Sequence, residues 1–319
     1  MTGNIEITKQ RSRARRIISA YLETLGYNEI ETPILSRTAI PESTIELFET
    51  NRKQFDKNDA FYLLPSPELY MKKSLAAEGK SIYQFSKCFR NSEQTSAIHS
   101  SEFTMLEYYK VDADCMYSLK VTEGMLRELS SVFKTSVIPY NNTVISMREL
   151  VKRQTGIDIA VLRSKDEFQK SVEEKGVTIW DKNESRADTF NRLFVALVED
   201  KINTIAPVVT ITDYPSEISC LAKDDNTGLF KKRWEMYING IEIANCYSEE
   251  TIAEKTKEYF NIEDKAKKSS DPYFRSDKEL PNMALPESSG VAIGFDRLMM
   301  CLLDKKNIGE VIPFAEYLK

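Results

Sequence analysis

The clearest hydrophobic pattern in the chain is a pair of apolar and aromatic runs, Ile82–Phe89 and Phe103–Tyr109, around a polar loop. Runs rich in Tyr, Phe and Ile on either side of a polar connection are typical of two antiparallel strands. In a strand, every second side chain points to the same face. One face of the second strand is therefore expected to carry Phe103, Met105, Glu107 and Tyr109.

The loop between these strands holds Arg90, Glu93 and the only histidine of the chain, His99. An arginine at the mouth of a face that offers a ring, a carboxylate and a phenol suits a nucleotide and a small cationic substrate. The alternative interpretation is a half-buried hairpin whose charges are solvated, because short sequence patterns often occur without the function they suggest.

Helical periodicity predicts a helix over residues 8–26, ending at Gly26, and further helices over 113–134 and 186–202. A short strand over Tyr27–Glu31 is expected after the first helix. The helix over residues 8–26 carries four arginines: Arg11, Arg13, Arg15 and Arg16. We expect most of them to lie on a solvated face.

Phe61–Leu64 is a further strand candidate, and a periodic helical pattern follows it. Ser66 at the N-cap, Pro67 in the first helical position and Glu68 in the first turn make a good helix start. Helix capping alone would explain these three residues.

A second hairpin is predicted over residues 233–247, because Asn239-Gly240 between alternating apolar arms is a strong two-residue turn signal. In the register that this turn implies, Tyr237 opposes Glu242 and Glu235 opposes Ala244. Glu235 and Glu242 then share a face as diagonal neighbours, and two such carboxylates can hold Mg²⁺ together with substrate phosphates. Two exposed strand glutamates would give the same pattern.

The segment Gly290–Met300 leads from small and apolar residues into a helix start. Gly290 and Gly294 permit a close approach of the backbone. Arg297 falls in the first turn, where a cation opposes the helix dipole and is better explained if an anion binds there too. A salt bridge to Glu287 or Asp296 is the alternative.

Composition narrows these possibilities. The chain has 319 residues and 36.6 kDa, with 41% hydrophobic and 29% charged residues, as is ordinary for a globular enzyme. The net charge of −5 argues against a general basic surface for nucleic acid. No apolar run or signal peptide points to a membrane, so a cytoplasmic protein is expected. Five scattered cysteines and one histidine argue against a structural zinc site.

Three segments resemble the signature motifs of class II aminoacyl-tRNA synthetases: ITKQRSRARRIISAYLETLGYNEIETPIL, FRNSE with HSSEFTMLEYY, and GVAIGFDRLMM. PSPELYMK, TDYPSEIS and WEMYINGIEIANCYSEE are similar to the lysyl-tRNA synthetase branch. Ala292 and AIPESTIELFET resemble the truncated paralogues of that enzyme, which modify elongation factor P. The first motif begins almost at the N-terminus, so we expect no anticodon-binding domain.

The resemblance implies an α+β fold, with a mixed, mostly antiparallel sheet flanked by helices, in a homodimer. We expect one catalytic domain over residues 1–319, with a helical insertion within about 112–205. It implies ATP and Mg²⁺ as the bound groups. Residues implied to contact ATP are Arg90, Glu93, His99, Phe103, Glu242, Gly294 and Arg297, with Arg90 and Arg297 as the catalytic cations and Glu235 and Glu242 as metal ligands.

For the amino acid, the resemblance implies a pocket of Ser66, Glu68, Glu107, Tyr109, Asn245 and Glu249. A lysine-like acid carries two ammonium groups, and each one favours a charged acceptor. The expected activity is an ATP-dependent ligase that forms a lysyl or (R)-β-lysyl adenylate and passes it to a lysine of elongation factor P. The alternatives are a minimal synthetase that charges a tRNA or another acceptor, which the acidic pI disfavours, and an inactive paralogue that serves as a binding subunit.

Overall fold

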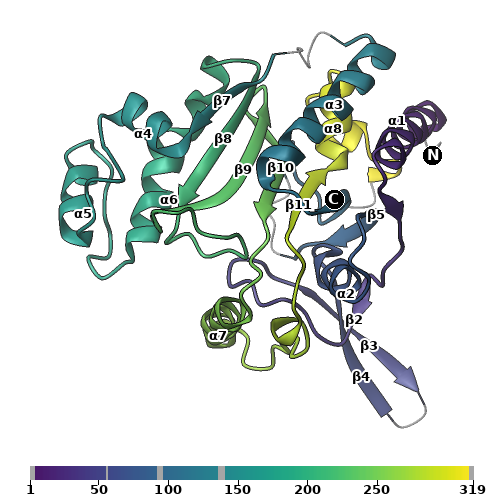
Figure 1. Ribbon diagram of the computed structural model, residues 1–319, viewed down its shortest axis with the longest axis horizontal. Helices are drawn as coiled ribbons and strands as arrows, with labels where there is room; N and C mark the ends of the chain where they lie inside the picture. The colour runs from purple at the N-terminus through teal and green to yellow at the C-terminus, as the bar shows by residue number, and fades with distance from the viewer. Residues whose placement is uncertain (1–3, 55–56, 92–95, 136–140, 316–319) are drawn as a thin grey trace.

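The computed structural model describes residues 4–54, 57–91, 96–135 and 141–315. In these residues eight strands form one sheet, in the order β1-β5-β6-β11-β10-β9-β8-β7 (Figure 1). Only β1 with β5 and β7 with β8 pair in parallel among its described strands. Its strands are β1 (Asn28–Glu29), β5 (Ile82–Phe89), β6 (Glu102–Val111), β7 (Thr143–Ser146), β8 (Val208–Pro215), β9 (Phe230–Ile238), β10 (Ile241–Ser248) and β11 (Ser288–Gly294). The expected mixed, mostly antiparallel sheet flanked by helices is confirmed.

Three helices cover one face of this sheet: α1 (Ile5–Thr24), α3 (Cys115–Phe133) and α8 (Phe295–Leu302). Leu106 and Tyr108 of β6 point into this core, together with Trp234 of β9, and all three are fully buried. Because side chains alternate along β6, Met105, Glu107 and Tyr109 must point to the opposite face. That opposite face is where the candidate site lies.

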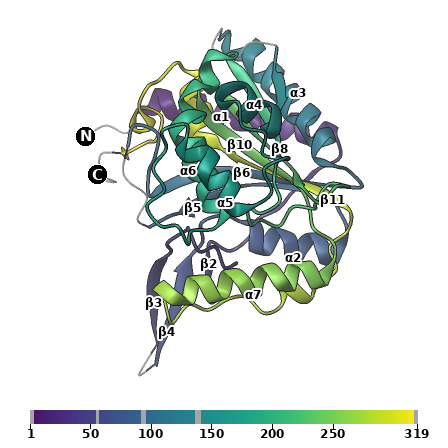
Figure 2. The same ribbon diagram turned by 90° about the vertical axis from the view of Figure 1, so that its left-hand side faces the viewer.

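A smaller sheet, in the order β2-β4-β3, stands beside the large one. Its strands are β2 (Leu35–Ser36), β3 (Phe48–Gln54) and β4 (Lys57–Leu63), and the hairpin of β3 and β4 projects from the body (Figure 1). The sequence predicted only the end of β4. Helices α2 (Glu68–Glu78) and α7 (Ala253–Ser270) lie near this sheet and share a small apolar core through Leu69 and Phe260 (Figure 2).

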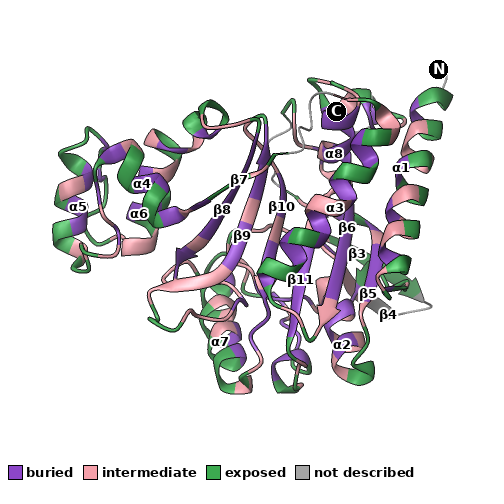
Figure 3. Ribbon diagram, turned by 45° about the horizontal axis from the view of Figure 1, so that its top comes forward, coloured by how far each residue is buried: buried purple, intermediate pink, exposed green. Residues whose placement is uncertain are grey.

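Residues 143–205 form a second packed region at the β7 edge of the sheet. It contains α4 (Met147–Thr155), α5 (Lys165–Glu173) and α6 (Arg186–Leu197), whose apolar sides pack on β8 and β9. Figure 3 shows these helices as a group beyond β7, buried on their inner sides and exposed on their outer sides. Among the described helices, none is both long enough and apolar enough to cross a membrane.

Two predictions about individual side chains, the helix cap at Ser66 and the exposed arginines of α1, were partly wrong. Helix α2 begins at Glu68 with Pro67 at its N-cap, and no side chain caps it, so Ser66 does not have the capping role that the sequence suggested. Arg13, Arg15 and Arg16 are exposed as predicted, but Arg11 is not on a solvated face. Its guanidinium is 2.5 Å from Asp296 and donates to the Val311 carbonyl at 2.9 Å.

Candidate active site

Two adjoining cavities lie on the open face of the large sheet. The larger cavity measures about 270 Å³ and the smaller about 70 Å³. Four residues line both, and they are Arg90, Met105, Asn245 and Ala292. The larger cavity also contains His99, Phe103, Glu242, Gly294 and Arg297, and the smaller contains Ser66, Glu68, Glu107, Tyr109 and Glu249. Two of the predicted site residues are missing from these walls: Glu235, and Glu93, which lies outside the described residues.

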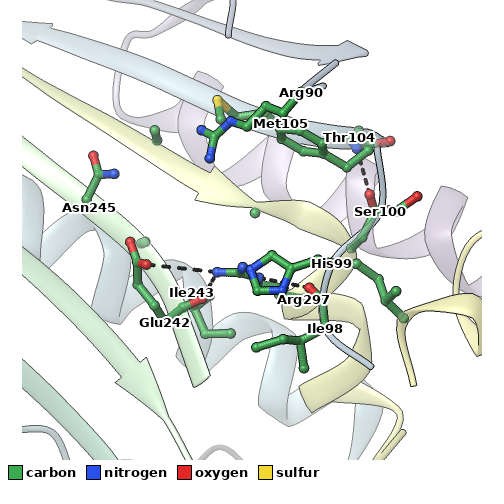
Figure 4. A pocket seen from close by; sticks show the side chains of 16 residues that line it. Arg90, Ile98, His99, Ser100, Thr104, Met105, Glu242, Ile243, Asn245 and Arg297 are labelled. Atoms are coloured by element: carbon green, nitrogen blue, oxygen red, sulfur yellow. Dashed lines mark hydrogen bonds and ion pairs between the residues drawn. The ribbon is translucent and has the colours of Figure 1, made fainter. Parts of the chain in front are cut away.

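Arg297 is held across the larger cavity by backbone acceptors. Its Nη1 donates to the Glu242 carbonyl at 3.0 Å and its Nε to the Ile98 carbonyl at 3.2 Å, with the Glu242 carboxylate 3.9 Å away (Figure 4). The alternative salt bridges from the sequence are wrong: Asp296 pairs with Arg11, and Glu287 pairs with Lys223.

Asp296 fixes the start of α8. Its carboxylate accepts the Thr104 backbone N–H at 2.6 Å and lies 2.5 Å from the Arg11 guanidinium. This ties the first turn of α8 to β6 and α1. The position of Arg297, one residue further on, therefore depends on three elements that are distant in sequence.

Arg90 stands at the end of β5, and its backbone N–H donates to the Ser101 carbonyl at 3.0 Å. Its guanidinium lies 5.3 Å from the centre of the Phe103 ring, a cation–π distance. His99 contributes from the connecting loop, where its Nδ1 is 2.7 Å from the Ser96 hydroxyl. An arginine, an aromatic ring and a histidine thus lie around one cavity, as the first hairpin predicted.

The register of the second hairpin differs from the prediction. The turn at Asn239-Gly240 has positive φ at both residues, as the sequence implies, and Tyr237 opposes Glu242. A bulge between Glu242 and Ala244 then shifts the ladder by one residue, so Glu235 opposes Asn245 and not Ala244. The turn residues determine which residues pair only while the hydrogen bonds between the two strands stay regular. A bulge interrupts that regularity, and the pattern of residue types does not reveal it.

Both carboxylate oxygens of Glu235 accept hydrogen bonds from neighbouring side chains. Its Oε2 accepts hydrogen bonds from the hydroxyls of Tyr214 at 2.5 Å and Tyr237 at 2.9 Å, and its Oε1 accepts one from Arg233. The Glu242 side chain is more open, with 38% exposure against 14% for Glu235.

Glu242, at the cavity wall, could bind a magnesium ion that phosphates help to hold, with Glu235 near it but outside the wall. Partial burial and the charge of Glu235 raise the pKa of Glu242 to about 7, so an added cation beside Glu242 would be favoured. Within the described residues, no group of three or more His, Cys, Asp or Glu could hold a metal ion alone. Mg²⁺ commonly uses one or two carboxylates and completes its shell with phosphates and water.

A buried lysine beside the smaller cavity was not predicted from the sequence. Lys72 is 1% exposed, and its ammonium lies 2.6 Å from Glu68 and 2.8 Å from Glu249. The pairing with Glu68 has the i, i+4 spacing of one helical turn, which could have been read from the sequence. Glu68 and Glu249 are thus bridged by a lysine of the chain itself.

The remaining carboxylate of the β6 face is Glu107, which accepts the Tyr109 hydroxyl at 2.6 Å. Burial raises the pKa of Glu107 to about 8 and that of Glu249 to about 7, so both carboxyl groups favour the protonated form more than usual. Gly290 is required at the wall: a Cβ there would come within 2.4 Å of Glu249 Oε1 and of Tyr109 Cε1.

Glu42 also lines the smaller cavity; the sequence had drawn attention to its segment, AIPESTIELFET, but not to this residue. It lies on an irregular segment before β3, where neither periodicity nor spacing applies. Burial and the charge of Glu68 raise its pKa to about 7. The cavity therefore presents four carboxylates, those of Glu42, Glu68, Glu107 and Glu249.

Comparisons with known proteins agree with this geometry. The family model described as tRNA synthetases class II (D, K and N) matches residues 3–317. The chain is 32% identical to a lysine–tRNA ligase of Pelotomaculum thermopropionicum, over 97% of this chain and 63% of that protein. It is also 32% identical to a lysine–tRNA ligase of Pseudomonas aeruginosa (strain PAO1), over 95% of this chain and 62% of that protein.

The chain thus spans somewhat less than two thirds of the length of these curated relatives. The matched residues nevertheless run through every strand and helix that builds the two cavities. The protein belongs to the class II tRNA synthetases of the D, K and N group.

Proposed function

We propose that the protein is an ATP-dependent ligase that activates lysine or (R)-β-lysine as its adenylate. The observation that carries this proposal is the pair of adjoining cavities that share Arg90. The larger cavity adds Arg297 and Glu242 to Arg90, which suits a triphosphate with its metal ion, and the smaller cavity adds four carboxylates, which suit a diamino acid. The family membership and the names of the relatives support the same chemistry.

In the first step, a carboxylate oxygen of the amino acid attacks the α-phosphorus of ATP. A P–O bond to the β-phosphate breaks, pyrophosphate leaves, and the acyl adenylate forms. No side chain of the protein needs to act as nucleophile, so its task is to align the two substrates and stabilise charge. Arg90 lines both cavities and is suited to hold the substrate carboxylate against the α-phosphate.

The triphosphate is assigned to the larger cavity. Arg297 would bind its terminal phosphate, while Phe103 and His99 would contact the nucleotide. Glu242, supported by Glu235, would hold Mg²⁺, which neutralises charge on the phosphates when it is bound.

In the second step, an amine or hydroxyl of an acceptor attacks the carbonyl carbon of the adenylate and AMP leaves. We propose the lysine ε-amine of elongation factor P as the acceptor, supported by the likeness of the chain around Ala292 to the paralogues that modify this factor. The second candidate acceptor is a tRNA, and the names of the relatives support it.

ATP–pyrophosphate exchange with the purified protein tests the activation step. Exchange that depends on lysine or (R)-β-lysine is expected, with no exchange in the absence of an amino acid. An Arg90→Ala variant should lose it, whereas Arg148→Ala, an exposed arginine paired with Asp158, should not. If no lysine-like acid supported exchange, the proposal would be wrong, and an inactive paralogue would be favoured.

Transfer of the labelled amino acid to elongation factor P and to total tRNA, in parallel reactions, tests the acceptor. Labelled elongation factor P without labelled tRNA is expected. The reverse result would assign the protein to tRNA charging and leave the activation step unchanged.

A further inference from the structure

The loop that carries Glu42, residues 41–46, is built into the fold. Three side chains on one face of α7, spaced four residues apart, hold its backbone. The Tyr259 hydroxyl donates to the Pro41 carbonyl (3.3 Å), the Ser43 N–H donates to Glu263 Oε2 (2.9 Å), and the Lys267 ammonium donates to the Ile45 carbonyl (2.6 Å). Lys267 is 1% exposed, so this contact lies inside the protein.

The same loop is also tied to the residue after Arg90. The Asn91 backbone N–H donates to the Glu46 carbonyl at 2.9 Å. The loop is therefore fixed from both sides, by α7 and by the end of β5. A carboxylate on such a loop is positioned before any ligand arrives, which reduces the entropy cost of binding.

The carboxylates of the smaller cavity differ in their partners. Lys72 bridges Glu68 and Glu249, and the Tyr109 hydroxyl donates to Glu107. Within the described residues, the Glu42 carboxylate makes no hydrogen bond or ion pair. A carboxylate that lines a cavity and lacks a partner is a favourable place for a cationic group of a ligand.

The cavity also has two ends. The loop that carries Glu42 is hydrogen-bonded to Asn91, the residue after Arg90. Glu249 pairs with Lys72, and Glu249 and Tyr109 lie together against Gly290. We therefore assign Glu42 to the Arg90 end of the cavity, and Tyr109 and Glu249 to the Lys72 end. A ligand whose carboxylate meets Arg90 would have its nearest amino group beside Glu42.

We propose that Glu42 is a substrate-binding residue that receives the amino group nearest the carboxylate of the activated acid. This assignment rests on the proposed function and adds a specificity-determining residue to it. The terminal ammonium of the substrate then goes to the far end, with Glu107 and Tyr109. Glu42 thereby selects diamino acids over acids that have only a terminal amine.

Glu42→Gln tests the assignment, because it removes the charge and keeps the shape. Binding of lysine, (R)-β-lysine and 6-aminohexanoic acid is measured by calorimetry for the wild type and the variant. The last compound lacks the amino group next to the carboxylate. The variant should bind the preferred diamino acid about 10- to 100-fold more weakly, the loss expected for a charged hydrogen bond. It should bind 6-aminohexanoic acid about as well as the wild type, which also reports that the cavity is intact.

Glu46→Gln is the matched control. It makes the same change on the same loop, at a half-exposed side chain that pairs with Lys267 outside the cavity, and it should leave all three affinities unchanged. Equal losses for all three compounds, or no loss with the diamino acids, would overturn the role of Glu42. Failure of the wild type to bind any diamino acid is a different result, because it would overturn the proposed function itself.

Discussion

The two cavities are built on the same strands and have opposite character. Along one face of β6, Phe103 belongs to the larger cavity, Met105 to both, and Glu107 and Tyr109 to the smaller. From Phe103 to Glu107, four residues along one strand, the wall changes from the cavity that contains Arg297 to the cavity that contains four glutamates. The sheet supplies a common rigid support, and the loops and helices at its edge supply the difference.

The cavities differ in whether their charged side chains are exposed or already paired. The Arg297 guanidinium is held by two backbone carbonyls and keeps 21% exposure, so an anion could still reach it. Beside the smaller cavity, the buried Lys72 ammonium lies between Glu68 and Glu249. An anion could therefore reach a cation in the larger cavity, whereas two of the four carboxylates of the smaller cavity already pair with a lysine of the chain.

Lys72→Met is expected to have the largest effect. It removes the cation from between Glu68 and Glu249 and leaves buried carboxylates without compensation. Breaking a buried ion pair in this way costs about 3–5 kcal/mol of unfolding free energy. Chemical denaturation at neutral pH measures the loss, which should shrink at acidic pH, where the carboxyl groups are protonated.

Lys267→Met is the control for this change. Lys267 is equally buried, but its partners are a backbone carbonyl and the half-exposed Glu46. Its loss should cost less than that of Lys72 and should depend less on pH. Equal losses of unfolding free energy in the two variants would mean that the carboxylates of the smaller cavity do not destabilise the fold when Lys72 is removed.

Glu242→Gln is expected to disable the larger cavity alone. Loss of the open carboxylate should reduce ATP–pyrophosphate exchange on the order of 100- to 1,000-fold, because charge on the phosphates is then poorly neutralised. Lysine binding, measured by calorimetry without ATP, should not change. Tyr237→Phe, which removes one of the donors to Glu235, should raise the Mg²⁺ concentration required only a few-fold. A loss of lysine binding in Glu242→Gln would show that the two cavities do not act separately.

Gly290→Ala is expected to disable the smaller cavity alone. The new methyl group would clash with Glu249 and Tyr109, and forcing a group into a packed site costs about 1–3 kcal/mol. The KM for the amino acid should rise by about 5- to 150-fold, with the KM for ATP little changed. Gly294→Ala is the comparison variant on the same strand. It lies in the wall of the larger cavity, a Cβ there meets nothing closer than 3.7 Å, and the KM for the amino acid should not change. A rise in both KM values for Gly290→Ala would contradict the separation.

The sequence predicted the strands and hairpins that bear most of the site, because those elements have a regular period. Period two on β6 was enough to place Glu107 and Tyr109 on one face, and the Asn239-Gly240 turn was enough to pair Tyr237 with Glu242. The assignment of the motifs to one family came from their order along the chain. The individual roles of the site residues remain proposals.

Three features were beyond that reasoning. The bulge at Glu242–Ala244 depends on packing and not on turn chemistry. Glu42 sits on an irregular loop whose position is set by α7, more than 200 residues later. Lys72 has a helical spacing to Glu68, but its contact with Glu249 needs the tertiary fold. Long-range contacts between irregular segments carry no local signal.

The smallest expected effect is a change in stability with pH. The pKa values of Glu107 and Glu249 are raised to about 8 and about 7 from an ordinary 4.5, so the ligand-free fold binds these protons more tightly than the unfolded chain does. Their contribution to stability is full below about pH 4.5 and is lost as the pH rises through about 7 to 8.

A bound diamino acid would reverse this, because its ammonium groups favour the charged carboxylates and lower their pKa values. The rise in melting temperature caused by lysine should therefore grow from about pH 6 to about pH 8, by an amount on the order of 1–2 kcal/mol in binding free energy. Glu107→Gln should flatten this dependence. A lysine effect that is independent of pH would mean that the carboxylates of the smaller cavity are already charged before the substrate arrives.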